Sequence, residues 1–253
     1  MIDIHAHFAD EGYDLEAEWK KIKAAGVEKV VLAGDTLEHS RMHAEFANTH
    51  DGCYFTVGVH PSAAEEVGAN FAETFSALAD NEKCVAVGEI GLDYHYDDTD
   101  KAAQYKAFIA QILLADGLGL PLQIHSRDAC ADTLSILREH KEQLKRGFLM
   151  HCYSYGAENL EAFLELGAYF SFGGVCCFKN ARRVVESVAE CPMSRIITET
   201  DSPYLSPFRG EKNTPANIPV IVARLAEIKG VSIHDINEAI RTNAMHLFPK
   251  LKA

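Results

Sequence analysis

Histidine and acidic residues in this sequence recur at the ends of short apolar runs. In the first run Asp3, His5 and His7 alternate, so in a β-strand all three side chains would point to one face. Later runs end in further residues of these types, namely His60, Glu89, His125, His151, Glu199 and Asp201. Polar groups that are buried together need partners, because an unpaired buried group costs several kcal/mol. We therefore expect a metal centre at these residues.

The expected metal ligands are too many for one ion. They are His5, His7, Glu89, His125, His151 and Asp201. A zinc ion in a protein usually takes about four ligands, whereas two ions that share a bridging carboxylate accommodate the whole set. We expect Glu89 to be that bridge and, with Asp201, to take part in catalysis, and Asp3 to orient an imidazole through its other ring nitrogen. Imidazole ligands favour zinc or manganese over magnesium, so the predicted cofactors are two divalent metal cations, Zn²⁺, Mn²⁺ or Mg²⁺.

The position of each ligand along the chain assigns it to one of the two ions. His5, His7 and Asp201 come from the first and last runs, which become neighbours if the strands close into a barrel, and would hold the first ion. His125 and His151 would hold the second ion. Bound divalent ions suit hydrolysis, because they lower the pKa of a water molecule and stabilise charge on a leaving oxygen. Asp201 is placed to accept the proton of that water.

Eight short apolar runs bounded by turn residues predict the strands that position these groups. The runs are Ile2–His7, Lys29–Gly34, Tyr54–His60, Val85–Leu92, Leu122–His125, Gly147–Cys152, Ala168–Gly173 and Arg195–Thr200. Stretches of helical periodicity lie between and after them, at Leu15–Ala25, His39–Ala47, Phe71–Leu78, Gln104–Ala115, Thr133–Leu144, Leu160–Leu166, Ala181–Ala189, Ile218–Ile228 and His234–Leu247.

This alternation predicts an α/β fold, a TIM (β/α)8 barrel, with residues 1–253 as a single domain. Successive strands start about 20 to 40 residues apart, which is the length of a βα unit. In such a barrel the carboxyl ends of all the strands meet on one face, where active sites are built. The alternative, a doubly wound sheet, usually carries a glycine-rich phosphate loop after its first strand, and this sequence has His5-Ala6-His7 there.

Composition excludes several classes of protein. The chain has 47% hydrophobic and 24% charged residues, which are values of a globular protein rather than of a disordered or collagen-like one. Its net charge of -13 is opposite to that of a general polyanion binder, so any nucleic acid must be held locally. The seven cysteines are scattered without a C-x-x-C pair, so neither a disulfide framework nor a thiolate zinc site is expected. No run approaches the roughly 18 apolar residues of a membrane span, and no signal segment is evident, so the predicted location is cytoplasmic.

Six motifs carry a family resemblance in their order and spacing. They are Asp3-Ile4-His5-Ala6-His7, Val57-Gly58-Val59-His60-Pro61, Gly88-Glu89-Ile90-Gly91-Leu92-Asp93-Tyr94, His125-Ser126-Arg127, His151-Cys152-Tyr153-Ser154 and Glu199-Thr200-Asp201-Ser202-Pro203-Tyr204-Leu205. On these residues the sequence resembles the TatD-related metal-dependent deoxyribonucleases, which lie within the amidohydrolase-like barrel superfamily. The resemblance implies a barrel, a divalent-metal centre on the six expected ligands, and hydrolysis of phosphodiester bonds in DNA.

The sequence departs from the pattern of this family in two places. Tyr155 stands where a glycine usually follows the His-Cys-aromatic-Ser motif. Residues 211–215 read Glu-Lys-Asn-Thr-Pro, where the family usually has an Arg-Asn-Glu-Pro-like stretch. Both positions lie in predicted substrate loops, so they bear on substrate preference more than on the metal site.

Substrate contacts are expected on the same face as the metal ligands. The predicted substrate-binding residues are His60, Arg127, Glu199, Tyr204 and Arg209. Further basic side chains after the seventh strand, and tyrosines that could stack on bases, are Lys179, Arg182, Arg183, Tyr94, Tyr153 and Tyr204. The predicted partner is DNA, single-stranded or at its ends, with no membrane and no obligate protein partner.

Two other functions remain open. Activated water attacks carbonyl carbon and phosphorus alike, so the same centre could cleave an aminoacyl-tRNA ester or a small-molecule amide or lactone. Against the commonest small-molecule hydrolases, Glu89 stands where many two-metal amidohydrolases carry a carbamylated lysine. The other function is that of a binding barrel without catalysis, in which the ligand set would be expected to be broken, and here it is intact.

Overall fold

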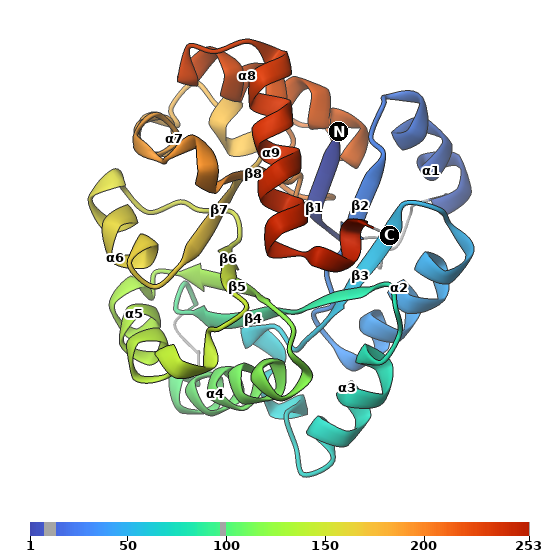
Figure 1. Ribbon diagram of the computed structural model, residues 1–253, viewed down its shortest axis with the longest axis vertical. Coiled ribbons are helices and arrows are strands. Elements are labelled where there is room, and N and C mark those ends of the chain that lie inside the picture. The colour runs from blue at the N-terminus through green and yellow to red at the C-terminus, as the bar shows by residue number, and fades with distance from the viewer. Residues whose placement is uncertain (8–13, 97–99, 253) are drawn as a thin grey trace.

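A computed structural model describes residues 1–7, 14–96 and 100–252 of the chain (Figure 1). Within these residues eight parallel strands form one sheet whose spatial order is the order of the chain. The strands are β1 (Ile2–Ala6), β2 (Lys29–Leu32), β3 (Cys53–Val57), β4 (Cys84–Asp93), β5 (Leu122–Arg127), β6 (Phe148–Met150), β7 (Ala168–Phe172) and β8 (Ile196–Thr198). The helices are α1 (Leu15–Ala24), α2 (Leu37–Thr49), α3 (Phe71–Ala79), α4 (Lys101–Leu118), α5 (Cys130–Glu139), α6 (Leu160–Leu164), α7 (Arg182–Glu190), α8 (Ile218–Lys229) and α9 (Ile233–Leu247).

The predicted barrel is confirmed. Figure 1 shows the helices on the outside of the ring of strands, and each predicted strand and helix overlaps an observed one. The main differences lie around β6. This strand ends at Met150, so His151 lies just beyond it, and α5 ends at Glu139 rather than at Leu144 because the chain turns back there to enter β6.

Side chains and glycines set the ends of several helices. Asp14, Asp100 and Ser232 accept a hydrogen bond from a backbone N–H in the first turn of α1, α4 and α9, which satisfies a donor that has no partner within the helix. Gly119 and Gly230 end α4 and α8 in the left-handed conformation that glycine adopts without strain. The helical segments are therefore delimited by local sequence as well as by packing on the sheet.

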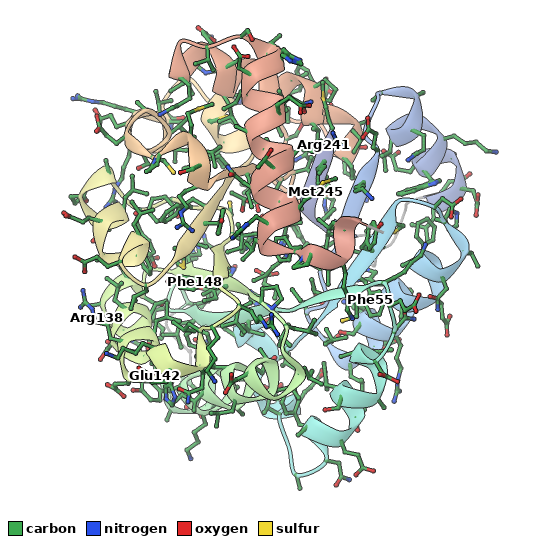
Figure 2. All side chains as sticks on the ribbon, in the orientation of Figure 1. Phe55, Arg138, Glu142, Phe148, Arg241 and Met245 are labelled. Atoms are coloured by element: carbon green, nitrogen blue, oxygen red, sulfur yellow. The ribbon has the colours of Figure 1, made fainter. Side chains whose placement is uncertain are left out.

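Residues of one strand pack alternately inside and outside the barrel. On β2, Val31 packs with Ile4 in the interior, whereas Val30 and Leu32 belong to the layer between strands and helices. Figure 2 shows Phe55 and Phe148 within the molecule and Arg138 and Glu142 at its periphery. None of the helices in the described part of the chain has the length and hydropathy needed to cross a membrane.

The amino-terminal end of the barrel is closed by the last described part of the chain. Phe248 and Leu251, which follow α9, are fully buried against Ile2, Tyr54 and Val85, which lie at the starts of β1, β3 and β4. Figure 1 shows α9 crossing this end of the barrel. Because this end is filled by apolar side chains, polar chemistry is confined to the opposite, carboxyl end of the strands.

The barrel closes between β1 and the segment that follows β8. The backbone N–H of Asp201 donates to His5 O at 2.9 Å, and the backbone N–H of His7 donates to Ser202 O at 2.7 Å. Thr198 adds a bond from its hydroxyl to Ile2 O at 2.8 Å. The first and last strands are thus neighbours, as a closed barrel requires.

Asp3 contributes to this closure rather than to the orientation of an imidazole. Its Oδ1 accepts from the backbone N–H groups of Thr200 and His5 at 3.0 and 3.2 Å, and its Oδ2 accepts from the Thr200 hydroxyl at 2.6 Å. The expectation that Asp3 orients a ligand imidazole is therefore wrong. Burial raises the pKa of the Asp3 carboxyl to about 8 against these hydrogen bonds, so the bonds are needed to keep the group stable inside the barrel.

Replacing Thr200 tests the role of Asp3 in closure. Thr200→Val keeps the shape of the side chain but removes the hydroxyl that bonds the buried Asp3 carboxyl group and Ser202 of the same closing segment, so the free energy of unfolding should fall by about 2 kcal/mol. Urea denaturation measures this change. Thr49→Val, at an exposed threonine of α2, is the control and should shift stability by less than about 0.5 kcal/mol. An equal effect of the two substitutions would contradict the role given to Asp3.

Candidate metal centre

Six polar side chains meet at the carboxyl ends of the strands. They are His5, Glu89 and His125 on β1, β4 and β5, and His7, His151 and Asp201 in the segments that follow β1, β6 and β8. Their ligand atoms fall into groups within which all atoms lie within 4.8 Å of one another. The structure therefore brings together all six residues that the sequence nominated as ligands.

Glu89 lies between two pairs of imidazoles and turns one oxygen toward each pair. Its Oε2 is 3.4 Å from His5 Nε2 and 3.3 Å from His7 Nε2. Its Oε1 is 2.6 Å from His125 Nδ1 and 2.9 Å from His151 Nε2. A carboxylate whose two oxygens face separate sets of donors is suited to bridge two cations.

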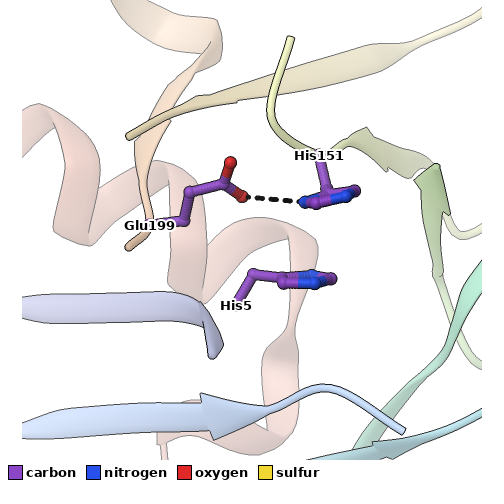
Figure 3. Close-up of side chains that lie close together, drawn as sticks. All are labelled: His5, His151 and Glu199. Atoms are coloured by element: carbon purple, nitrogen blue, oxygen red, sulfur yellow. Dashed lines mark ion pairs between the residues drawn. The ribbon is translucent and has the colours of Figure 1, made fainter. Parts of the chain in front are cut away.

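The imidazoles of His5 and His151, one from each pair, are stacked. Their ring centroids are 3.8 Å apart and the rings are nearly parallel, at 12°. Figure 3 shows the ring of His151 lying face to face above that of His5, with Glu199 paired to His151. Because the Nε2 atoms of both rings point at Glu89, the stack aligns one donor from each pair toward the same carboxylate.

Asp201 completes the group formed by His5 and His7. Its Oδ1 is 3.6 Å from His7 Nε2 and 3.9 Å from His5 Nε2. The residue has a φ of 54°, a left-handed conformation that aspartate tolerates better than most residues. Its backbone N–H is one of the bonds that close the barrel, so closure itself holds this carboxylate against β1.

Two of the candidate ligand imidazoles have a partner that the sequence did not reveal. Gln123 Oε1 lies 2.9 Å from His5 Nδ1, and Asp93 Oδ2 lies 3.2 Å from His125 Nε2. Such partners fix which ring nitrogen carries the proton and leave the other free for a metal. Weak signals existed, since Gln123 is two residues before His125 on the same strand face, and Asp93 ends the strand that carries Glu89.

Glu199 supports His151 from behind. Its Oε2 is 3.4 Å from His151 Nδ1 and accepts a hydrogen bond from the Ser171 hydroxyl at 2.5 Å. The Glu199 side chain has no exposed surface, so the prediction that it contacts substrate does not fit its position. His7 is similarly backed by Asp35, whose Oδ2 is 4.0 Å from His7 Nδ1.

The charges of this cluster balance one another. Burial disfavours the charged form of His7, but hydrogen bonds to Asp201 and Glu89 outweigh it and raise the pKa of His7 to about 10. Burial would raise the pKa of Glu89, yet the imidazoles of His151 and His60 help to hold it well below its usual range. The carboxylates of Glu89 and Asp201 are therefore stabilised by nearby positive charge. The donor set fits divalent cations, which bind imidazole and carboxylate in their deprotonated forms.

Two predicted substrate-binding residues stand at the edge of the cluster. His60 Nδ1 accepts from the backbone N–H of Ser62 at 3.1 Å, which places the proton of a neutral ring on Nε2, 3.7 Å from Glu89 Oε1. Burial lowers the pKa of His60 to about 4. Tyr204 is 59% exposed, and its ring centroid lies 6.4 Å from that of His7. A neutral donor and an exposed aromatic ring therefore lie next to the expected ligands.

The remaining predicted basic residues are exposed to solvent and lie in different segments of the chain. Arg127 ends β5 and lies over the exposed ring of Tyr96, with its guanidinium carbon 5.9 Å from the ring centroid. Arg209 and Lys179 are exposed in the segments after β8 and β7. Their roles in substrate binding stay predictions.

Several other side chains that were expected to contact substrate already have partners within the protein. Tyr153 is only 3% exposed and packs in the core, so it cannot stack on a base. The Tyr94 hydroxyl donates to Asp132 at 2.8 Å. Arg182 and Arg183 each pair with a glutamate, which reduces their value as phosphate ligands.

Fold and site together define a metal-dependent hydrolase. The chain belongs to the TatD related DNase family, whose model matches residues 2–249. Uncharacterized metal-dependent hydrolase YabD of Bacillus subtilis (strain 168) is 36% identical over 252 residues, which cover 98% of both chains. A protein of Cronobacter turicensis named 3'-5' ssDNA/RNA exonuclease TatD is 32% identical over 261 residues, covering 99% of this chain and 98% of its own. The crystal structure of YJJV, a TatD homolog from Escherichia coli K12, matches with a TM-score of 0.92 at 28% identity and covers 98% of both chains.

Gln123→Leu tests whether the partners of the imidazoles matter for metal binding. The substitution removes the acceptor from His5 Nδ1, so the apparent affinity for zinc should fall roughly 10- to 100-fold. Titration of metal-free protein with zinc against a competing chelator measures it. Gln111→Leu is the matched control, because Gln111 is equally buried but bonds the backbone of Val59. Wild-type affinity in Gln123→Leu would overturn the orienting role.

Proposed function

We propose that residues 1–253 form one domain of a deoxyribonuclease that hydrolyses phosphodiester bonds with two divalent cations. The observation that carries this proposal is Glu89, whose two oxygens face separate pairs of imidazole nitrogens. Membership of the TatD related DNase family and the exonuclease name of a relative support the choice of a nucleic acid as substrate. A cytoplasmic location stays a prediction.

The two cations have distinct ligands in this proposal. His5, His7 and Asp201 would hold the first, His125 and His151 would hold the second, and Glu89 would contribute to both. The two pairs of imidazole nitrogens that face separate oxygens of Glu89 support this division. Donors rich in imidazole favour Zn²⁺ or Mn²⁺, and Mg²⁺ is the third candidate.

The mechanism assigns a separate task to each side chain. Divalent cations held here supply Lewis acidity, which lowers the pKa of water and offsets negative charge on phosphoryl oxygens. Asp201 turns Oδ1 toward the imidazoles, so its other oxygen takes the proton of the attacking water. His60 donates its Nε2 proton to a phosphate oxygen, and Arg127 grips a phosphate with paired N–H groups.

The substrate of this proposal is a single strand or a strand end. Tyr204 offers an exposed ring on which an unpaired base can stack, whereas a base in a duplex has its faces covered. The net charge of -13 repels a polyanion at a distance, so the metal centre and its few basic neighbours must bind the strand locally, within about the 8 Å over which salt leaves charges unscreened. RNA offers the same phosphates and is a further candidate.

Metal analysis tests the bridge. Reconstituted wild-type protein should bind two ions per chain, and Glu89→Gln should lose at least one, because an amide bridges two cations poorly. Elemental analysis after gel filtration provides the measurement. Glu142→Gln, at an exposed position on the periphery of the molecule (Figure 2), should keep the wild-type stoichiometry. One ion in saturating metal, with unchanged activity of Glu89→Gln, would exclude the bridge.

Kinetics on a panel of substrates test the reaction. Metal-loaded protein should cleave end-labelled single-stranded DNA, and Asp201→Asn should lower kcat about 100-fold or more, because an amide accepts no proton from water. Arg127→Ala should raise KM about tenfold with a smaller effect on kcat, since a phosphate contact acts in ground and transition states alike. Arg138→Ala, at an exposed arginine of α5, serves as its control.

The same panel includes duplex DNA, RNA and an aminoacyl-tRNA. Cleavage of the aminoacyl ester by wild-type protein, without cleavage of any phosphodiester, would replace the nuclease assignment by that of an esterase on the same centre.

A further inference from the structure

Tyr155 joins the two loops that follow β5 and β6. It lies four residues beyond His151, at the position where the family resemblance leads one to expect glycine. Its hydroxyl oxygen is 2.8 Å from Ser126 Oγ and accepts from the backbone N–H of Ala129 at 3.1 Å. A glycine could make neither contact, so this link is a property of the present chain.

Tyr155 is itself firmly held. Its backbone carbonyl accepts from the Ser187 hydroxyl of α7 at 2.8 Å. Its ring packs edge-on against Tyr153, at 5.9 Å between centroids, and Tyr153 packs in turn against Phe170 of β7 at 4.9 Å. Because Tyr153 is buried, the phenol hydroxyl of Tyr155 projects from a rigid base toward the loop after β5.

That loop depends on the hydroxyl for its hydrogen bonds. Asp128 has a φ of 54°, and Ala129 immediately precedes α5 and provides no side-chain cap. The N–H of this buried residue donates to the Tyr155 hydroxyl oxygen. Ser126 Oγ continues the network to Thr133 Oγ1 at 2.7 Å. The turn between β5 and α5 is therefore fixed at both its ends by a single phenol.

The position of the Ser126 side chain determines the direction of its neighbours' side chains on the strand. Successive side chains of a strand point to opposite sides, and His125, Ser126 and Arg127 are the last residues of β5. With Ser126 held toward Tyr155, the side chains of His125 and Arg127 are both directed to the opposite side. His125 lies in the candidate metal centre, so Arg127 is directed to the face where the substrate would bind.

We propose that Tyr155 is a positioning residue that holds Arg127 for contact with a substrate phosphate. The inference rests on the proposed nuclease function, in which Arg127 binds that phosphate. Tyr155 reaches neither substrate nor cations in this scheme and acts only through the loop of residues 126–129. It thereby adds to substrate affinity in a chain that lacks the usual glycine.

A kinetic double-mutant cycle tests the proposal. Tyr155→Phe removes only the hydroxyl and should raise KM for a single-stranded oligodeoxynucleotide about five- to tenfold, with kcat within about twofold of wild type. In the Arg127→Ala background the same substitution should have almost no effect on KM, because the residue it positions is absent. Tyr54→Phe is the control, since the Tyr54 hydroxyl contacts Lys29 near the start of β3.

Hydrogen–deuterium exchange of the metal-loaded protein tests the loop independently of any substrate. Tyr155→Phe should speed exchange in peptides that contain residues 126–130, whereas Tyr54→Phe should leave them unchanged. Unaltered exchange together with unaltered KM would overturn the proposal, as would equal effects of Tyr155→Phe with and without Arg127. If wild-type protein cleaves no DNA, the proposed function fails, and exchange in this loop still decides whether Tyr155 positions it.

Discussion

Burial of the Glu89 carboxylate among imidazoles is the constraint on which this molecule depends. A charge in that position loses its hydration, and only the surrounding donors compensate for the loss. The strands must also approach closely around it. A Cβ on Gly88 would lie 2.5 Å from Gln123 Cβ, and one on Gly91 would lie 2.0 Å from the carbonyl oxygen of His125. The glycines that flank Glu89 therefore let β5 approach closely enough to place its histidine beside the carboxylate.

The six candidate ligands could be grouped from the sequence because two simple rules bring them together. Period-two alternation places His5 and His7 on one face of a strand, and the barrel brings all strand ends to one side. The side chains that contact the backs of the imidazoles were harder to predict from the sequence. The sequence did not show that Glu199 is buried beside the imidazole of His151. It also did not show that Asp3 bonds Thr200 at the closure of the barrel instead of an imidazole. The spacing of strands along the sequence does not give their register in the barrel, and the register decides which side chains meet.

The number of basic side chains available to bind phosphate was overestimated for a related reason. Sequence position shows that an arginine is near a strand end, but not that a nearby glutamate already neutralises it, as happens to Arg182 and Arg183. What is left around the centre is a small number of cationic and aromatic groups, chief among them Arg127 and Tyr204. An acidic protein of this kind would select its substrate by contacts made after arrival, with little long-range attraction to guide the approach.

Closure of the barrel by residues far apart in the chain has a consequence for biosynthesis. While the ribosome has delivered only the segment up to α7, β1 and β7 are both unpaired edges, and the apolar starts of the strands lack Phe248 and Leu251. Such edges invite pairing with other chains. Asp201, which is grouped with His5 and His7, arrives only with the strand-closing segment. Assembly of the candidate metal cluster and pairing of the open strand edges are thus completed by the same late step of translation, and burial of the strand starts follows with Phe248 and Leu251.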